Sequence, residues 1–300
     1  MRPKILIYVK EYSDELAKRQ PWYSIGKLKS DLAAMGNEVQ IITKSCSLPE
    51  ISESHLIKTF GLSDLFTCRP ICARFTYLIT FPIYGRDRVF KMRLKTLKSN
   101  WRDLYRIFLM ALVPRVVLRR ALSRADNIIC ISDRSQAYLR ALNIKTHKYY
   151  PFVFGNWGGA NLQKVGKHGI TLGYFGPPYR TRCFDQVVKF FEWIHSTELN
   201  YKSKVICRIE RSALKKEEKR YRAVFKRAKI ELVSGFLSRE SLTKELLDID
   251  VFILPFEVVM SELPIVVLEA LELRRKIVST EDSGIAELTA DSTNVLILDK

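Results

Sequence analysis

The chain has 300 residues, of which 47% are hydrophobic, with 13 Gly and 11 Pro, and its formal net charge is +18. This composition is ordinary for a globular protein, and the length suits two domains of roughly 150 residues, each large enough to bury a core without disulfides or metals. No run approaches about 18 uncharged apolar residues, which excludes a helix that spans a membrane.

The positive charge is concentrated in the first half of the chain. Residues 1–150 carry 27 Lys+Arg against 12 Asp+Glu, whereas residues 151–300 carry 23 against 20. A basic half beside a nearly neutral half indicates a polyanionic neighbour, which is a nucleic acid, an anionic membrane surface or an acidic substrate.

Two features indicate the compartment. Lys10 and Glu11 interrupt the apolar run Ile5–Val9, so we expect no signal peptide. The six cysteines are scattered and form no Cys-x-x-Cys pair. We therefore expect reduced thiols, no metal site and a cytoplasmic location.

The first half opens with a β-α-β pattern. We predict a strand at 4–9, a helix at 24–35 closed by Gly36-Asn37, and a strand at 39–43, which together begin a Rossmann-like domain. Further along, we predict strands at 56–60, 77–81, 127–132 and 148–153 and a helix at 134–142.

A long basic region separates two of these strands. Residues 86–124 contain twelve Lys+Arg, two Asp and many interleaved aromatic and aliphatic residues. We expect it to be helical with a break at Pro114. Three interpretations remain open: an amphipathic contact with an anionic membrane surface, a nucleic-acid contact, and a core helix pair whose basic face is solvated.

The second half alternates strands and helices more regularly. We predict strands at 170–176, 204–209, 229–234, 251–256, 276–280 and 294–298, and helices around 183–196, 213–227, 238–247, 264–273 and 283–289. This alternation is typical of a mainly parallel sheet. The Gly/Asn-rich segment 155–159 is the predicted linker, which gives an N-terminal domain at 1–155 and a C-terminal domain at 156–300.

The first candidate site is the turn into the helix at 264–273. Amides at a helix start just past a buried strand favour an anion, and Pro264 suits the start of a helix. Glu262 and Glu269 flank this start and could accept hydrogen bonds from sugar hydroxyls. The alternative is two solvated glutamates beside an apolar helix.

The second candidate site is the loop Gly176-Pro177-Pro178-Tyr179-Arg180-Thr181-Arg182. Gly176 lets the backbone approach a ligand, and an arginine at this position can clamp a diphosphate. The alternative is a surface loop with two solvated arginines. Both candidate sites follow strands at the same sheet edge, so together they indicate a sugar-nucleotide site.

The second half resembles the donor domain of the retaining GT-B glycosyltransferases of the family 4 ("glycosyl transferases group 1") type. The matching segments, in chain order, are 170–176 with Arg182, 233–237, 248–255 (Asp-Ile-Asp-Val-Phe-Ile-Leu-Pro), 261–270 and 276–287. In the first half, Ala125–Ser132 resembles a strand of the same family. The resemblance covers nearly all of 151–300 and weaker patches of 1–150.

The resemblance implies an α/β protein of the GT-B class, in which two Rossmann-like domains with mostly parallel sheets face a cleft. It implies Glu262 and Arg182 as catalytic residues. The implied donor-binding residues are Gly176, Arg180, Gly235, Phe236, Pro264, Ile265, Val266 and Glu269. It further implies sugar transfer with retention from a UDP- or GDP-linked donor to a glycan or lipid-linked acceptor, without a metal or other cofactor, at the inner face of the membrane.

Several features depart from the family pattern. Six residues separate Glu262 from Glu269 where the family has seven, and Cys183 follows Arg182 where glycine is usual. The acceptor-side histidine after the strand at 77–81 and the N-terminal glycine pair are missing, and no crossover helices follow residue 298. These departures favour an alternative, a catalytically impaired GT-B-like protein that binds a nucleotide-sugar or a polyanion without turnover.

Overall fold

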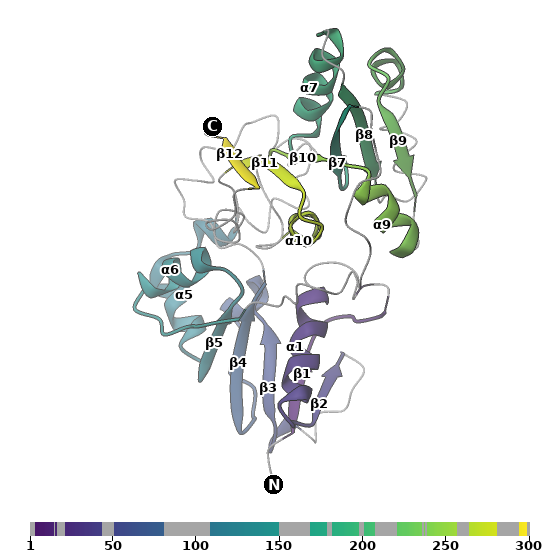
Figure 1. The fold of residues 1–300 in the computed structure, drawn as a ribbon. Coiled ribbons are helices and arrows are strands. Elements are labelled where there is room, and N and C mark those ends of the chain that lie inside the picture. The colour runs from purple at the N-terminus through teal and green to yellow at the C-terminus, as the bar shows by residue number, and fades with distance from the viewer. Residues whose placement is uncertain are drawn as a thin grey trace. The chain divides into compact units, whose positions relative to one another are not determined.

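The computed structural model describes residues 4–14, 16, 22–43, 51–80, 109–149, 169–178, 182–197, 201–207, 221–235, 237, 239–256, 264–280 and 294–298. These residues fall into two compact units, 4–149 and 169–298, and each contains one parallel sheet (Figure 1). The predicted domain boundary after residue 155 lies outside the described residues.

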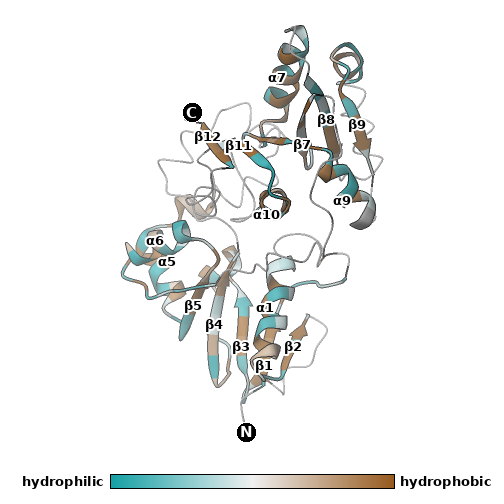
Figure 2. Ribbon diagram, viewed as in Figure 1, coloured by the Kyte–Doolittle hydropathy of each residue, from teal (hydrophilic) through white to brown (hydrophobic). Residues whose placement is uncertain are grey.

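The sheet of the first unit has the strand order β2-β1-β3-β4-β5-β6, and all its pairs are parallel. Its strands are β1 (Ile5–Tyr8), β2 (Val39–Ile42), β3 (His55–Thr59), β4 (Arg74–Ile79), β5 (Asn127–Cys130) and β6 (His147–Lys148). β1 is apolar and buried, as expected of a parallel strand that is covered on both faces (Figure 2).

The helices of this unit are α1 (Trp22–Ala34), the 3-10 helix η3 (Leu62–Leu65), α5 (Arg115–Leu122) and α6 (Asp133–Arg140). Gly36 closes α1 in the left-handed region at φ 79°, and the amide of Asn37 donates to the carbonyl of Leu32, as in a Schellman ending. Residues 109–112 are helical, and Pro114 then caps α5. The predicted break at Pro114 is therefore present, whereas residues 86–108 of the basic region lie outside the described residues.

Two predicted strands of this unit have the wrong bounds. β4 begins at Arg74, three residues before the predicted start at Tyr77, because Arg74 pairs with His55 of β3 and the Asp126 carboxylate accepts from the amide of Phe75. β6, His147–Lys148, begins one residue before the predicted strand at 148–153 because His147 pairs with Ile129 of β5, and residues 150–153 lie outside the described residues. In both cases, cross-strand pairing decides the boundary.

The sheet of the second unit has the order β12-β11-β10-β7-β8-β9, again with all pairs parallel. Its strands are β7 (Ile170–Phe175), β8 (Tyr201–Cys207), β9 (Glu231–Ser234), β10 (Val251–Leu254), β11 (Lys276–Thr280) and β12 (Val295–Leu298). Its labelled helices are α7 (Phe184–Ser196), α9 (Arg239–Leu247) and α10 (Ile265–Glu272). All six predicted strands are present, with bounds that shift by up to three residues.

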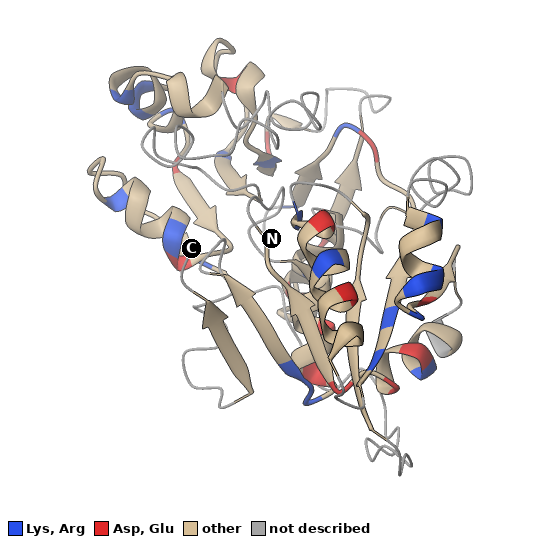
Figure 3. Cartoon of the chain, turned by 90° about the horizontal axis from the view of Figure 1, so that it is seen from above, with Lys and Arg blue, Asp and Glu red and all other residues tan. Residues whose placement is uncertain are grey.

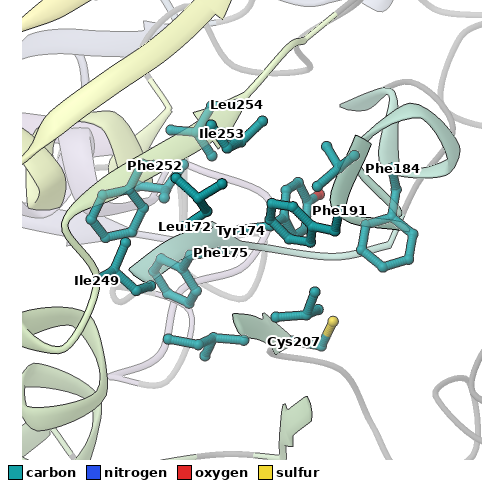
Figure 4. Packing of buried hydrophobic residues seen from close by; sticks show 14 of the residues in the cluster. Leu172, Tyr174, Phe175, Phe184, Phe191, Cys207, Ile249, Phe252, Ile253 and Leu254 are labelled. Atoms are coloured by element: carbon teal, nitrogen blue, oxygen red, sulfur yellow. The ribbon is translucent and has the colours of Figure 1, made fainter. Parts of the chain in front are cut away.

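The core of the second unit is rich in aromatic residues (Figure 4). The ring of Phe184 lies 5.0 Å from that of Tyr174 and 5.2 Å from that of Tyr221. Gly173 makes room in β7 for Ile249, because a Cβ at this position would lie 2.3 Å from the Ile249 side chain. The rings of Tyr174 and Phe184 thus pack α7 against β7.

Charged residues lie mainly on helices and near strand ends (Figure 3). Lys204, in contrast, lies within the strand β8. Its side chain is only 5% exposed, and its Nζ lies 3.1, 2.8 and 2.9 Å from carboxylate oxygens of Glu231, Glu245 and Asp248. Burial alone lowers the pKa of Lys204, but the hydrogen bonds to these carboxylates raise it above the ordinary lysine value. Lys204 therefore ties β8 and β9 to the end of α9.

We expect Lys204→Met to lower the free energy of unfolding by about 1–3 kcal/mol, because it removes the hydrogen bonds to three partly exposed carboxylates. Urea unfolding at neutral pH measures the effect. Lys202→Met, at an exposed position of the same strand, is the matched control and should change stability little. A Lys204→Met protein as stable as this control would show that the cluster is not stabilising.

In the first unit, Asp126 joins the start of β5 to the segment before β4. Its oxygens accept from Arg69 Nη1 and Nη2 at 2.9 and 2.7 Å and from the amide of Phe75 at 2.7 Å. Burial opposes ionisation, but the bonds from Phe75 and Arg69 and the charge of Arg74 hold the pKa of Asp126 below its usual value.

A carboxylate whose pKa is lowered by folding stabilises the protein above its ordinary pKa, and this stabilisation is lost as the pH falls through the folded-state pKa. We therefore expect the stability of the wild type to fall below about pH 4 more steeply than that of Asp126→Asn. Urea unfolding midpoints between neutral and acid pH test this. Glu53→Gln, at an exposed turn before β3, should keep the wild-type slope. Equal slopes for Asp126→Asn and wild type would contradict the assignment.

Candidate functional site

In the sheet of the second unit, the order in which successive strands are added reverses between β7 and β10. Numbered from its own first strand, its order is 6-5-4-1-2-3, so connections leave β7 and β10 toward opposite ends of the sheet. Val251 and Phe252 of β10 pair with Leu172 and Gly173 of β7. The segments that follow these two strands therefore start side by side, at the topological switch point where open α/β sheets bind ligands.

The segment after β7 turns sharply at Gly176. Its φ is +140°, a conformation that residues with a side chain rarely adopt. The hydroxyl of the buried Tyr174 donates to the carbonyl of Pro177 at 2.6 Å and so fixes the backbone of the turn. A Cβ at Gly176 would lie 2.6 Å from Nη1 of Arg182, so a side chain at this position would displace the guanidinium.

Arg182 returns to this turn just before α7. Its guanidinium carbon lies 5.3 Å from the centre of the Phe256 ring, within the range of a cation–π contact. Phe256 is fully buried beyond the end of β10, and Arg182 is half-buried. The guanidinium is therefore held at the switch point by the Gly176 turn and by the aromatic ring after β10.

Cys183 provides the bend between Arg182 and α7. It is the N-cap residue of α7 and adopts the left-handed conformation, with φ 53° and ψ 31°. Glycine adopts this conformation without strain, whereas a residue with a Cβ is strained by it. Cys183 therefore holds its backbone geometry at some cost in strain.

The segment after β10 is anchored to β11. Ser279 Oγ donates to the carbonyl of Leu254 at 2.7 Å, and Thr280 Oγ1 donates to the carbonyl of Phe256. These hydroxyls satisfy the backbone where β10 ends, and they hold the Phe256 ring in place.

α10 starts beyond this segment. Pro264 is its N-cap residue, so the helix begins at Ile265, one residue later than predicted. No described side chain caps this start, and Val266 and Val267 anchor it in the core. Its first amides therefore form a helix N-terminus of the kind that suits an anion.

The predicted residues are distributed as follows. Gly176 and Arg182 are in contact, and Pro264, Ile265 and Val266 form the start of α10. Glu269 is half-buried in the second turn of α10. Glu262, Arg180 and Phe236 lie outside the described residues.

Gly235 follows β9 at the same edge of the sheet. Its φ is +103°, and a Cβ there would meet no atom within 4 Å. β9 is two strands from β7, so Gly235 is not a neighbour of the Gly176 turn in the sheet.

Sequence reasoning missed Tyr174 and Phe256, which position the turn and the guanidinium. Each is an aromatic residue at or just beyond the end of an apolar strand, and such residues usually serve only the core. The adjacency of β7 and β10 gives them a second role. No local sequence pattern predicts that β7 and β10 are neighbours, although the strand order of a Rossmann-like sheet could have suggested it.

Within the described ranges, no three His, Cys, Asp or Glu side chains are grouped so that they could hold a metal ion. The described helices include none that is long and apolar enough to cross a membrane. Of the described cysteines, Cys68, Cys72, Cys130, Cys183 and Cys207 form no disulfide, and burial raises the pKa of Cys207 to about 12.

The fold is that of the GT-B glycosyltransferases. WaaG, a glycosyltransferase of lipopolysaccharide biosynthesis, superposes with a TM-score of 0.61 at 13% identity, over 99% of this chain and 86% of its own. Anabaena HepE in complex with UDP and glucose gives 0.58 at 13% identity, over 99% and 86%. A trehalose-6-phosphate synthase, studied for glycosyl transfer with retention, gives 0.64 at 11% identity, over 99% and 87%. No family model and no curated protein sequence matches this chain.

The left-handed conformation of Cys183 predicts an unusual order of stability among variants at this position. Cys183→Gly should be more stable than Cys183→Ala by about 1 kcal/mol, because glycine alone adopts this backbone without strain. Cys183→Val should be the least stable, since a β-branched residue is poorly suited to positive φ. Urea unfolding of the three variants gives the order.

The matched control is Cys207, which is buried in the extended strand β8. There, Cys207→Val should be tolerated and Cys207→Gly should be the less stable variant, because strands favour β-branched residues over glycine. The same order at both positions would contradict a left-handed Cys183.

Proposed function

We propose that the protein is a retaining glycosyltransferase that moves a sugar from a UDP- or GDP-linked donor to a glycan or lipid-linked acceptor. The observation that carries the proposal is the position of Arg182, whose guanidinium is held against the Gly176 turn and the Phe256 ring at the switch point of the second sheet. The fold shared with nucleotide-sugar-dependent glycosyltransferases supports it.

The proposed chemistry follows from where negative charge develops. When the bond between the anomeric carbon and the donor phosphate breaks, charge grows on the leaving diphosphate. The fork of Arg182 matches two phosphate oxygens, and the first amides of α10, at Ile265 and Val266, favour the same charge through the helix dipole. These groups take the place of a metal ion, so we propose transfer without one.

We assign the remaining predicted residues to contacts with the other parts of the donor. Glu262 accepts hydrogen bonds from hydroxyl groups of the donor sugar, and Glu269 accepts them from the ribose. Arg180 adds positive charge near the diphosphate. Gly235 and Phe236, after β9, lie toward the base. The proposed place of reaction is the cytoplasmic face of a membrane, where a lipid-linked acceptor would be presented.

A second candidate function is donor binding without turnover. The observation that favours it is the shortened separation of Glu262 and Glu269, six residues in place of the seven typical of the resembled family. Binding through Arg182 and α10 does not depend on this separation, whereas the placement of Glu262 at the reacting carbon does. The two candidates therefore share the donor site and differ in catalysis.

Thermal unfolding with UDP- and GDP-sugars tests the donor site. A ligand that binds only the folded protein stabilises it by about 2.7 kcal/mol at a hundredfold excess over its Kd, which is a clear rise in melting temperature. We expect such a rise for wild type and a much smaller one for Arg182→Ala. Arg222→Ala, at an exposed position of the helical residues 221–227, is the matched control and should behave as wild type.

Slow donor hydrolysis, measured on the same proteins with Glu262→Ala added, separates the two candidates. Nucleotide release by wild type that Glu262→Ala and Arg182→Ala both reduce supports a transferase. A thermal shift without release supports binding alone. If no nucleotide or nucleotide-sugar shifts the melting temperature, the donor-site assignment is wrong.

A further inference from the structure

β12 forms one edge of the sheet of the second unit, and of the described strands only β11 pairs with it (Figure 1). Its sequence, Val-Leu-Ile-Leu, is apolar throughout (Figure 2). Val295 and Ile297 pack against the core, whereas Leu296 and Leu298 are 57% and 43% exposed. The strand therefore combines a backbone edge that no described strand covers with two apolar side chains in water, and this combination favours pairing with a further strand.

The other edge strands of the two sheets carry polar or charged side chains. Gln40 of β2 and Glu231 of β9 are exposed, and β6 consists of two residues, one of which is Lys148. Such side chains on an edge discourage pairing between protein molecules. Among the edge strands that the structure describes, β12 alone lacks this protection.

The pairing with β11 decides which backbone groups of β12 face a further strand. The amide of Ile277 donates to the carbonyl of Asn294 at 2.8 Å, and Ile277 lies opposite Val295. In a parallel pair, the residues of one strand direct their backbone groups alternately toward and away from the other strand. Leu296 thus points its amide and carbonyl toward β11, and Val295 and Ile297 point theirs away from it.

We infer that β12 pairs with β12 of a second copy of this chain, in antiparallel orientation about a twofold axis. The outward-pointing backbone groups set the register, in which Val295 exchanges hydrogen bonds with Ile297 of the second copy and the symmetry repeats this exchange. Leu296 then lies on the axis, opposite Leu296 of the second copy. The pair uses no residue of the donor site, so the inference goes beyond the proposed function and is independent of it.

The exposed side chains of β12 are complementary to themselves in this register. The two copies of Leu296 meet at a closely spaced, non-hydrogen-bonded position, where Cβ atoms lie about 5 Å apart. Leu298 of each copy lies diagonally to Leu296 of the other, at about 7 Å. The leucines of both copies thus form one apolar cluster, and a second copy supplies the apolar, extended strand that this edge fits.

Charge favours this edge as the contact between two copies. Each copy has a net charge of +18, so two basic surfaces would repel each other. No charged residue occurs in the sequence between Asp291 and Asp299, so the pairing of β12 places no like charges directly opposite each other. The same pairing of β6 would bring Lys148 beside the basic end of its own copy.

Sedimentation velocity of the full chain over a wide range of concentrations tests the inference. We expect wild type to interconvert between monomer and dimer. The dimer should strengthen as the salt concentration rises, because salt screens the repulsion between two positively charged copies and does not weaken apolar contacts. Pairing uses up the edge, so the assembly should stop at the dimer.

Two opposite substitutions at residue 296 test the register. Leu296→Lys and Leu296→Glu each place like charges opposite each other across the axis, and each should raise the dissociation constant of the dimer at least about tenfold. An equal mixture of the two variants should restore a dimer, because the lysine of one variant then lies opposite the glutamate of the other. At a position away from the axis, each substituted residue would meet a different residue of the second copy, and mixing would restore nothing.

Met35→Lys and Met35→Glu are the matched controls, since Met35 is 67% exposed after α1 in the first unit. Both should dimerise as wild type does. Melting temperatures show whether each variant is folded, and donor-induced shifts report on the donor site independently of dimerisation.

A wild type that is monomeric at every concentration overturns the inference and leaves the edge to a strand of another protein. A dimer that neither substitution at Leu296 weakens is formed elsewhere on the molecule, which also overturns it. Folded variants whose mixture stays monomeric contradict pairing about Leu296. Open-ended oligomers, or a dimer that dissociates at high salt, contradict an apolar pairing of two edges.

Discussion

The parallel pairing of β7 with β10 is the interaction on which the candidate site depends. It joins the first and fourth strands of the second sheet, counted along the chain. From these two strands the chain continues toward opposite ends of the sheet. Without this pairing, the Gly176 turn and Phe256 would have no reason to be neighbours, since about 80 residues separate them in the chain. With it, Arg182 contacts both.

The residues around Arg182 show how a binding geometry can be prepared by groups that never meet a ligand. Tyr174 fixes the turn through the Pro177 carbonyl, and Thr280 fixes the backbone of Phe256. Cys183 accepts a left-handed conformation so that α7 can begin directly after the arginine. A guanidinium held in this way loses little freedom on binding a diphosphate, which is the advantage of preorganisation.

The first unit is stabilised by hydrogen bonds of two arginines and one carboxylate as well as by apolar packing. Asp126 and Arg69 join the strand β5 to the loop before β4, and Arg124 joins the end of α5 to the same loop. Part of the strong positive charge of this half therefore serves the fold. Three further arginines, Arg115, Arg119 and Arg120, are exposed on α5.

The sequence by itself determined the alternation of strands and helices, the parallel sheets of both units and the start of α10, because these follow from hydrophobic periodicity and from Gly and Pro. It also singled out Gly176 and Arg182, since a glycine after a buried strand and a nearby arginine are local signals. Only the tertiary structure decided the start of β4, the roles of Tyr174 and Phe256, and the inward turn of Arg124. Each depends on a partner distant in sequence, which local patterns do not encode.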